Sequence, residues 1–175
     1  MKSAVFSRLI CITCLALAPA ATQAAVEAAA SPHNVSVHYI DPGNFTEARR
    51  SFGVHLIDAN AYLKPLKTYI AKRASRILAP GQRLDIEVTD VDRAGEYEPW
   101  RGPEFNDIRI VKSIYPPRID LNFTLYGADG KVLREGSRKL RDAFFLSRGM
   151  GADQDLLRYE KSLVDRWLRH GTNKL

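Results

Sequence analysis

The chain has 175 residues, of which 45% are hydrophobic and 26% are charged, and its formal net charge at pH 7 is +6. This length and hydrophobic content suit one domain with a core of its own and exclude an intrinsically disordered chain. The basic residues form no dense patch, so we expect no nucleic acid among its partners.

The first 24 residues have the layout of a cleavable secretory signal peptide. Lys2 and Arg8 form its positive start, residues 9–21 are apolar or small, and small residues precede a cleavage site after Ala24, with Ala25 as the alternative. The apolar run is shorter than the about 20 residues that a membrane-spanning helix needs, which disfavours an uncleaved anchor. We therefore expect an exported, periplasmic protein with no transmembrane segment.

Export also changes the composition of the chain. Both cysteines, Cys11 and Cys14, lie in the signal peptide, so the mature chain has none and a structural zinc site is not expected. Removal of the signal lowers the net charge from +6 to +4, because two basic residues and no acidic residue are lost. We interpret residues 25–34 as a flexible tether and residues 35–171 as a single domain.

Hydrophobic periodicity predicts the elements of this domain in chain order. Residues 35–39 alternate as a strand, and residues 45–58 are irregular apart from a helical turn near their start. Residues 60–79 have apolar side chains at spacings of three and four, which predicts a helix. Because Pro65 is tolerated only in a first helical turn, we expect the regular helix to begin near Leu63.

The middle of the chain has mainly strand patterns. Residues 84–92 alternate with acidic residues on the outer face, residues 93–103 form a loop with two prolines, and residues 107–112 form a short strand. Residues 118–126 and 131–140 alternate again around a Gly-Ala-Asp-Gly turn, which predicts a β-hairpin.

A glycine-bearing break at residues 147–153 precedes a last helix at residues 154–170. Leu156, Leu163 and Trp167 lie on one edge of its apolar stripe. Antiparallel hairpins with two amphipathic helices predict an α+β fold, a two-layer sandwich in which both helices cover one face of a mostly antiparallel sheet.

Three segments of the chain resemble a known family. They are Thr89–Trp100 (TDVDRAGEYEPW), Asp107–Lys112 (DIRIVK) and the YPPRI run that ends at Ile119. This pattern is similar to that of an uncharacterised family of exported proteobacterial proteins, classed as a domain of unknown function. The resemblance extends over nearly the whole mature chain and supports a periplasmic setting, but it implies no activity, substrate or catalytic residue.

Two carboxylates are the strongest candidates for chemistry. Asp90 and Asp92 are two residues apart, so on an extended chain both side chains point to the same side. Such a pair could bind a hard cation or act as the acid and base of a hydrolase. The alternative is the solvated face of a strand, because no calcium-loop pattern accompanies the pair. We expect no metal and no cofactor.

The loop around Trp100 is the best candidate for recognition. Trp100 and Arg101 stand between two prolines, which makes the loop stiff. With Glu98, Asp92 and Arg109 they could bind a ligand or partner. The alternative is that Trp100 folds back as a lid over one end of the sheet.

No nucleophile motif or phosphate-binding loop is present in the sequence. We therefore expect a monomeric, non-catalytic binding or accessory module of the cell envelope, whose partner is an envelope protein or a glycan. Two alternatives remain open at this point. One is a hydrolase or metal-dependent enzyme that uses Asp90 and Asp92, and the other is a module that binds anionic membranes through the basic helix at residues 63–79.

Overall fold

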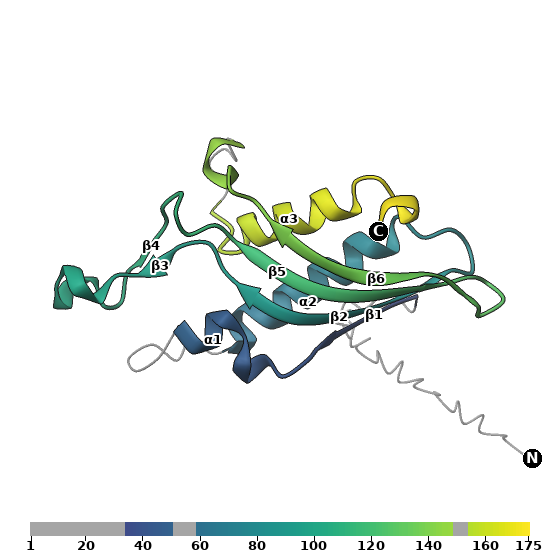
Figure 1. Ribbon diagram of the computed structural model, residues 1–175, viewed down its shortest axis with the longest axis horizontal. Helices are drawn as coiled ribbons and strands as arrows, with labels where there is room; N and C mark the ends of the chain where they lie inside the picture. The colour runs from purple at the N-terminus through teal and green to yellow at the C-terminus, as the bar shows by residue number, and fades with distance from the viewer. Residues whose placement is uncertain (1–33, 51–58, 149–153) are drawn as a thin grey trace, which may run out of the picture.

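The computed structural model describes residues 34–50, 59–148 and 154–175, and places them around one four-stranded sheet with the order β1-β2-β5-β6 (Figure 1). The predicted signal peptide and most of the predicted tether lie outside the described residues. β1 pairs in parallel with β2, whereas β2–β5 and β5–β6 are antiparallel. The strands are β1 (Val35–Tyr39), β2 (Arg83–Asp92), β5 (Arg118–Tyr126) and β6 (Val132–Arg141).

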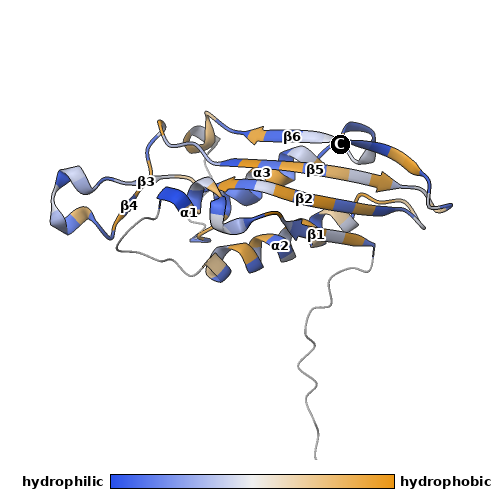
Figure 2. Ribbon diagram, turned by 60° about the horizontal axis from the view of Figure 1, so that its bottom comes forward, coloured by the Kyte–Doolittle hydropathy of each residue, from blue (hydrophilic) through white to orange (hydrophobic). Residues whose placement is uncertain are grey.

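Two helices, α2 (Ala59–Ser75) and α3 (Arg158–Leu168), pack side by side on one face of this sheet (Figures 1 and 2). The alternating apolar residues of β2 and β5 face them and are almost fully buried. The shared core includes Leu84, Ile86, Val88, Leu121, Phe123, Leu66, Ile70, Leu163, Val164 and Trp167. The predicted α+β class, with a mostly antiparallel sheet and helices on one face, is confirmed.

The two helices run in the same direction. Tyr62 and Leu157 lie near their starts and line one cavity, while further along Arg73 forms a 2.6 Å ion pair with Asp165. The N-termini of α2 and α3 therefore lie at the same end of the molecule, the end from which residues 95–115 project (Figure 1).

The predicted hairpin agrees with β5 and β6 to within one residue, but both helix predictions need correction. α2 begins at Ala59, so Pro65 lies inside the helix rather than in its first turn. Pro65 is exposed, and water can therefore satisfy the carbonyl that loses its helical hydrogen bond. α3 begins only at Arg158, which leaves Leu156 outside the helix and 78% exposed rather than on the apolar stripe.

A short helix continues the edge of the sheet where β1 ends. β1 pairs with β2 as far as Tyr39 and Val88, after which a β-bulge shifts the register of β2 before Asp90. The chain then turns through Pro42–Asn44 (η1) into α1 (Thr46–Arg50), which lies beside the end of β2 (Figure 1). This arrangement brings Asp90 and Asp92 next to α1.

Residues 95–115 form an arm that projects from the same end of the sheet (Figure 1). It consists of the two-residue strands β3 (Glu96–Tyr97) and β4 (Arg109–Ile110), joined by two 3₁₀ turns at Pro99–Arg101 (η2) and Pro103–Phe105 (η3). The Gly95 amide donates to the Tyr115 carbonyl at 3.0 Å and closes its base. Gly95 has a φ of 87°, and a Cβ there would lie 2.9 Å from the Ile110 carbonyl oxygen, so only glycine fits.

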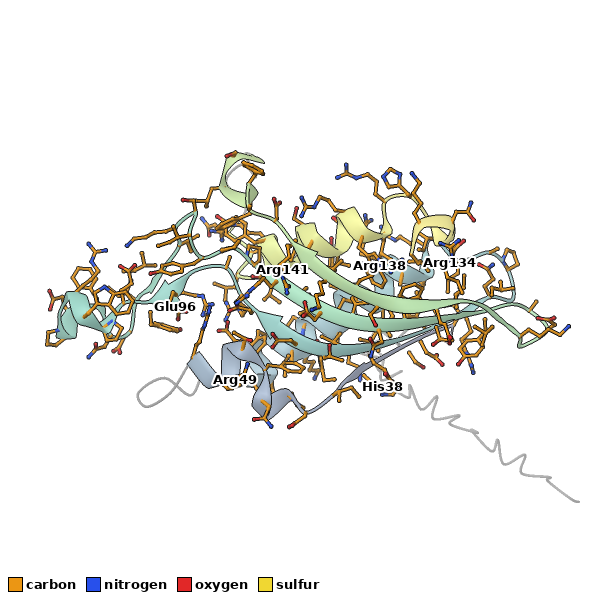
Figure 3. The ribbon with its side chains drawn as sticks, viewed as in Figure 1. His38, Arg49, Glu96, Arg134, Arg138 and Arg141 are labelled. Carbon is orange, nitrogen blue, oxygen red and sulfur yellow. The ribbon has the colours of Figure 1, made fainter. Side chains whose placement is uncertain are left out.

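β6 is one of the two edge strands of the described four-stranded sheet, and basic side chains occur along its length. Arg134, Arg138 and Arg141 follow one another along the strand (Figure 3). Arg138 stacks on the Phe123 ring and donates to the carbonyl of Leu175, while Arg141 forms a 2.7 Å ion pair with Asp120. Charged side chains on an edge strand oppose pairing with further strands.

None of the helices in the described part of the chain is both long and apolar enough to span a membrane.

Candidate functional site

The candidate site lies at the end of the sheet, where β2, α1 and the arm meet. The two carboxylates that the sequence singled out both bind α1, one helical turn apart. The backbone amide and the hydroxyl of Thr46 donate to Asp90 at 2.6 and 2.7 Å. Arg50 donates to both oxygens of Asp92 at 3.1 and 3.2 Å. Arg118, which pairs with Asp92 across the sheet, donates its Nε to the same carboxylate at 2.8 Å.

These contacts bear on the enzyme hypothesis. Asp90 accepts two hydrogen bonds from α1, and Asp92 is buried between two guanidinium groups. A carboxylate paired with arginine in this way is occupied and is not presented to a water molecule or a cation. Within the ranges that the structure describes, no cluster of three or more His, Cys, Asp or Glu side chains could hold a metal ion.

The centre of the site is a buried ion pair between Glu47 of α1 and Arg109 of β4. The two nitrogens Nη1 and Nη2 of Arg109 lie 2.7 and 2.8 Å from the two oxygens of Glu47. Glu47 is only 3% exposed, and it also accepts the backbone amide of Arg93 at 3.0 Å. Burial by itself lowers the pKa of the Arg109 guanidinium. The facing Glu47 carboxylate more than reverses this effect, so the pKa of Arg109 is raised and the guanidinium stays charged.

Arg109 also ties the arm to the end of β2 through main-chain contacts. Its Nε donates to the Ala94 carbonyl at 2.8 Å, and its Nη2 donates to the carbonyls of Arg93 and Gly95 at 2.9 and 3.1 Å. A second link comes from Arg50, which forms a 3.1 Å ion pair with Glu96. Glu96 lies at the base of the arm (Figure 3). The arm is therefore held to the body by directional, charged contacts at its base.

Glu98 braces the arm internally. Its buried carboxylate accepts from Lys112 at 2.5 and 2.7 Å, from the Tyr115 hydroxyl at 2.9 Å and from Arg101 at 3.2 Å. The hydrogen bond from Lys112 is the main cause that lowers the pKa of Glu98 below its ordinary range. These contacts join the outgoing and returning segments of the arm, so its shape does not depend on the two short strands alone.

Trp100 lies near the tip of the arm and is 70% exposed. The alternative prediction, in which it folds back as a lid over the sheet, is therefore wrong, because the braced arm carries it away from the core. Other exposed apolar side chains accompany it on the arm, namely Ile108, Val111 and Ile114. Beside Trp100, the guanidinium of Arg101 lies 4.9 Å from the centre of the Phe105 ring.

The predicted site residues thus have different roles. Asp92 anchors α1, Arg109 holds the base of the arm, Glu98 and Arg101 brace the arm, and Trp100 is presented to solvent. A cavity of about 380 Å³ lies between the arm base and the body. It is lined by Arg50, Asp92, Arg93, Ile114, Tyr115, Pro116 and Arg118.

A protein-family comparison matches residues 33–170 to "Protein of unknown function (DUF3016)". The chain belongs to the DUF3016 family. The match covers most of the chain and extends across the sheet, both long helices and the arm, so the arm is part of the DUF3016 domain. No curated protein and no solved structure matches the chain.

The sequence analysis missed four buried charges in the described part of this DUF3016 domain, namely Glu47, Arg93, Asp142 and Glu160. Glu160 lies on the apolar stripe of α3, between Leu157 and Val164, and this position was the available signal. It is only 1% exposed. Its Oε1 accepts the Ala94 amide at 2.8 Å, while Oε2 has no hydrogen-bond partner within the described residues. Burial raises the pKa of this carboxyl above its ordinary value.

Replacement of Glu47 by Gln tests the central ion pair. We expect Glu47→Gln to lower the free energy of unfolding by about 3 kcal/mol, because it leaves the buried Arg109 without its carboxylate partner. Asp129→Asn is the matched control, since it removes an exposed ion pair with Lys131 and is expected to cost less than about 1 kcal/mol. Urea unfolding measures both variants, and equal small losses would contradict the assignment.

The pH dependence of stability tests Glu160. Above pH about 4.3, Glu160 ionises in the unfolded chain while the folded carboxyl stays protonated. The folded state therefore loses stability as the pH rises towards the raised pKa of the folded carboxyl. Glu160→Gln keeps an acceptor for Ala94 but does not titrate. We expect its stability relative to the wild type to rise with pH above about 4.3, by at most about 1.4 kcal/mol per pH unit. In urea titrations, Glu135→Gln on exposed β6 should show no such trend, and a flat difference for Glu160→Gln would contradict the assignment.

Proposed function

We propose that this DUF3016 domain is a non-catalytic binding module of the periplasm that contacts a partner protein through its arm. The observation that carries the proposal is the presentation of Trp100, which a charged and hydrogen-bonded brace holds away from the body. Binding to a rigid element costs little conformational entropy. Exposed tryptophan is also among the residues that most often dominate the binding energy of an interface.

The composition of the arm favours a protein over a glycan or a membrane. Besides Trp100, the arm exposes the aliphatic side chains of Ile108, Val111 and Ile114, which suit an apolar protein surface better than a sugar ring. The arm contains four acidic and three basic residues, so anionic headgroups are not attracted to it. We interpret the basic face of α2 as an ordinary solvent-exposed helix face rather than a membrane-binding surface.

The engagement of the described carboxylates supports a binding role. Asp90 and Asp92 serve as anchors for α1, and Glu47 and Glu98 each face a cation. These four carboxylates thus hold α1 and the arm in place.

The export step can be tested on its own. When the full chain is expressed in a Gram-negative host, we expect osmotic shock to release a product whose intact mass corresponds to a chain beginning at Ala25. Ala24→Arg should block cleavage at this site, because a signal peptidase requires a small residue there. A cytoplasmic product that still begins at Met1 would contradict the periplasmic assignment.

Crosslinking from the tip of the arm tests the partner. A photoreactive amino acid placed at residue 104, an exposed position on the adjoining turn η3, leaves Trp100 in place and should give one discrete protein adduct in intact cells. Trp100→Ala in the same chain should abolish this adduct. The same group at Phe144, which is also exposed but lies outside the arm, should not give this adduct. Because Trp100 is exposed, its replacement should change the free energy of unfolding by less than about 0.5 kcal/mol.

A second substitution shows whether the adduct depends on the arm surface. Ile108→Asp, combined with the crosslinker at residue 104, should abolish the adduct by placing a charge in the apolar contact. Leu133→Asp changes a similarly exposed side chain on β6 and should leave the adduct intact. A glycan or lipid adduct, or a protein adduct that survives Ile108→Asp, would contradict the proposed contact.

A further inference from the structure

A second cavity, of about 270 Å³, shares Arg93 with the cavity at the arm base. It lies between the first turn of α2, the base of the arm and the residues just before α3, and it is open to solvent at Leu156. Apolar and aromatic side chains line it together with two arginines. The lining residues are Ala61, Tyr62, Arg93, Tyr97, Arg109, Leu156 and Leu157.

Two polar side chains at this cavity lack the partners that their burial demands. Arg93 is only 9% exposed, yet its Nε makes no hydrogen bond within the described residues. The hydroxyl of Tyr62, which is 4% exposed, likewise has no partner there, although the Arg93 guanidinium lies 5.4 Å from the centre of its ring. Buried polar atoms are nearly always paired, so an unpaired set beside a cavity points to a missing ligand or water.

The charge on Arg93 is also incompletely neutralised. Its closest carboxylate is that of Glu47, at 3.9 Å, and Glu47 already forms the two-pronged pair with Arg109 at 2.7 and 2.8 Å. The other nearby carboxyl is Glu160, and burial raises its pKa and favours its neutral form. A buried guanidinium that shares its anion with a second arginine can accept a further negative charge.

The helices favour an anion at the same place. α2 and α3 start at this end of the molecule (Figure 1), and the N-terminus of a helix carries a partial positive charge. Arg93 can only donate hydrogen bonds. Burial raises the pKa of Tyr62 to about 12, so its hydroxyl stays protonated at neutral pH and can donate as well.

We propose that this cavity binds a small carboxylate with an apolar body, with the carboxylate at Tyr62 and Arg93 and the body against Leu156, Leu157 and the Tyr97 ring. The volume is at the lower limit of ligand pockets and suits a molecule of about ten non-hydrogen atoms. This site is separate from the exposed surface of the arm, so it does not depend on the proposed protein partner.

Titration calorimetry with three probes of equal length tests the head group. Octanoate should bind the purified protein, octan-1-ol should bind at least about tenfold more weakly because it carries no charge for Arg93, and octylamine should not bind. Tyr62→Phe keeps the ring and removes one donor, and should weaken octanoate about tenfold with little effect on octan-1-ol. Equal binding of octanoate and octan-1-ol, or no binding of octanoate, would overturn the proposal.

A variant at the rim keeps the test valid if Tyr62→Phe disturbs the fold. Leu156 is highly exposed, so Leu156→Glu should fold normally while its charge repels the carboxylate. We expect Leu156→Glu to weaken octanoate at least about tenfold more than the neutral Leu156→Gln does. Leu133→Glu on β6 controls for the added negative charge and should bind octanoate as the wild type does. Equal octanoate affinities for Leu156→Glu and the wild type would place the probe elsewhere and refute the assignment.

Discussion

The pair between Glu47 and Arg109 is the contact on which this end of the molecule depends. Glu47 comes from the short helix α1, Arg109 from the returning strand of the arm, and both meet the backbone at the end of β2. Two strands of two residues each cannot hold a ribbon in place in water. The orientation of the arm is instead set by one buried, doubly hydrogen-bonded ion pair, whose geometry is directional in a way that apolar packing is not.

The side chains that form the core and the apolar side chains that are exposed to solvent on the arm therefore belong to different parts of the molecule. The sheet and helices α2 and α3 bury a continuous apolar core, which provides the main driving force for folding. The arm adds little to that core, since its large apolar side chains at Trp100, Ile108 and Ile114 are exposed. An exposed apolar group that does not serve folding is informative about binding, because soluble surfaces rarely gather several of them on one projecting element.

The sequence analysis predicted the strands and helices that local periodicity specifies. It missed the side-chain contacts between residues that are far apart in the sequence. The β5–β6 hairpin follows from strict alternation around a Gly-Asp turn, and it was predicted to within one residue. The start of α2 was predicted wrongly, because periodicity does not show that Pro65 faces water. The burial of Glu47 was not predictable, because its partner Arg109 is 62 residues away in the sequence. An isolated glutamate in an irregular segment is normally expected to be exposed to solvent. For Trp100, the sequence was compatible with a buried position over the sheet and with an exposed position on a stiff loop. The hydrogen bonds of Glu98 hold the arm away from the sheet, so Trp100 is exposed.

Glu47 also connects the arm to the cavity near α2, because it is the carboxylate closest to both Arg109 and Arg93. A charge placed beside one member of this group acts on all three, because Coulomb interactions reach every neighbouring charge. A carboxylate bound at Arg93 would therefore attract Arg109 and repel Glu47, so the cavity and the base of the arm are electrostatically linked. Any such coupling is reciprocal: the factor by which a ligand in the cavity changes the affinity of the arm for its partner equals the factor by which the partner changes the affinity of the cavity for its ligand.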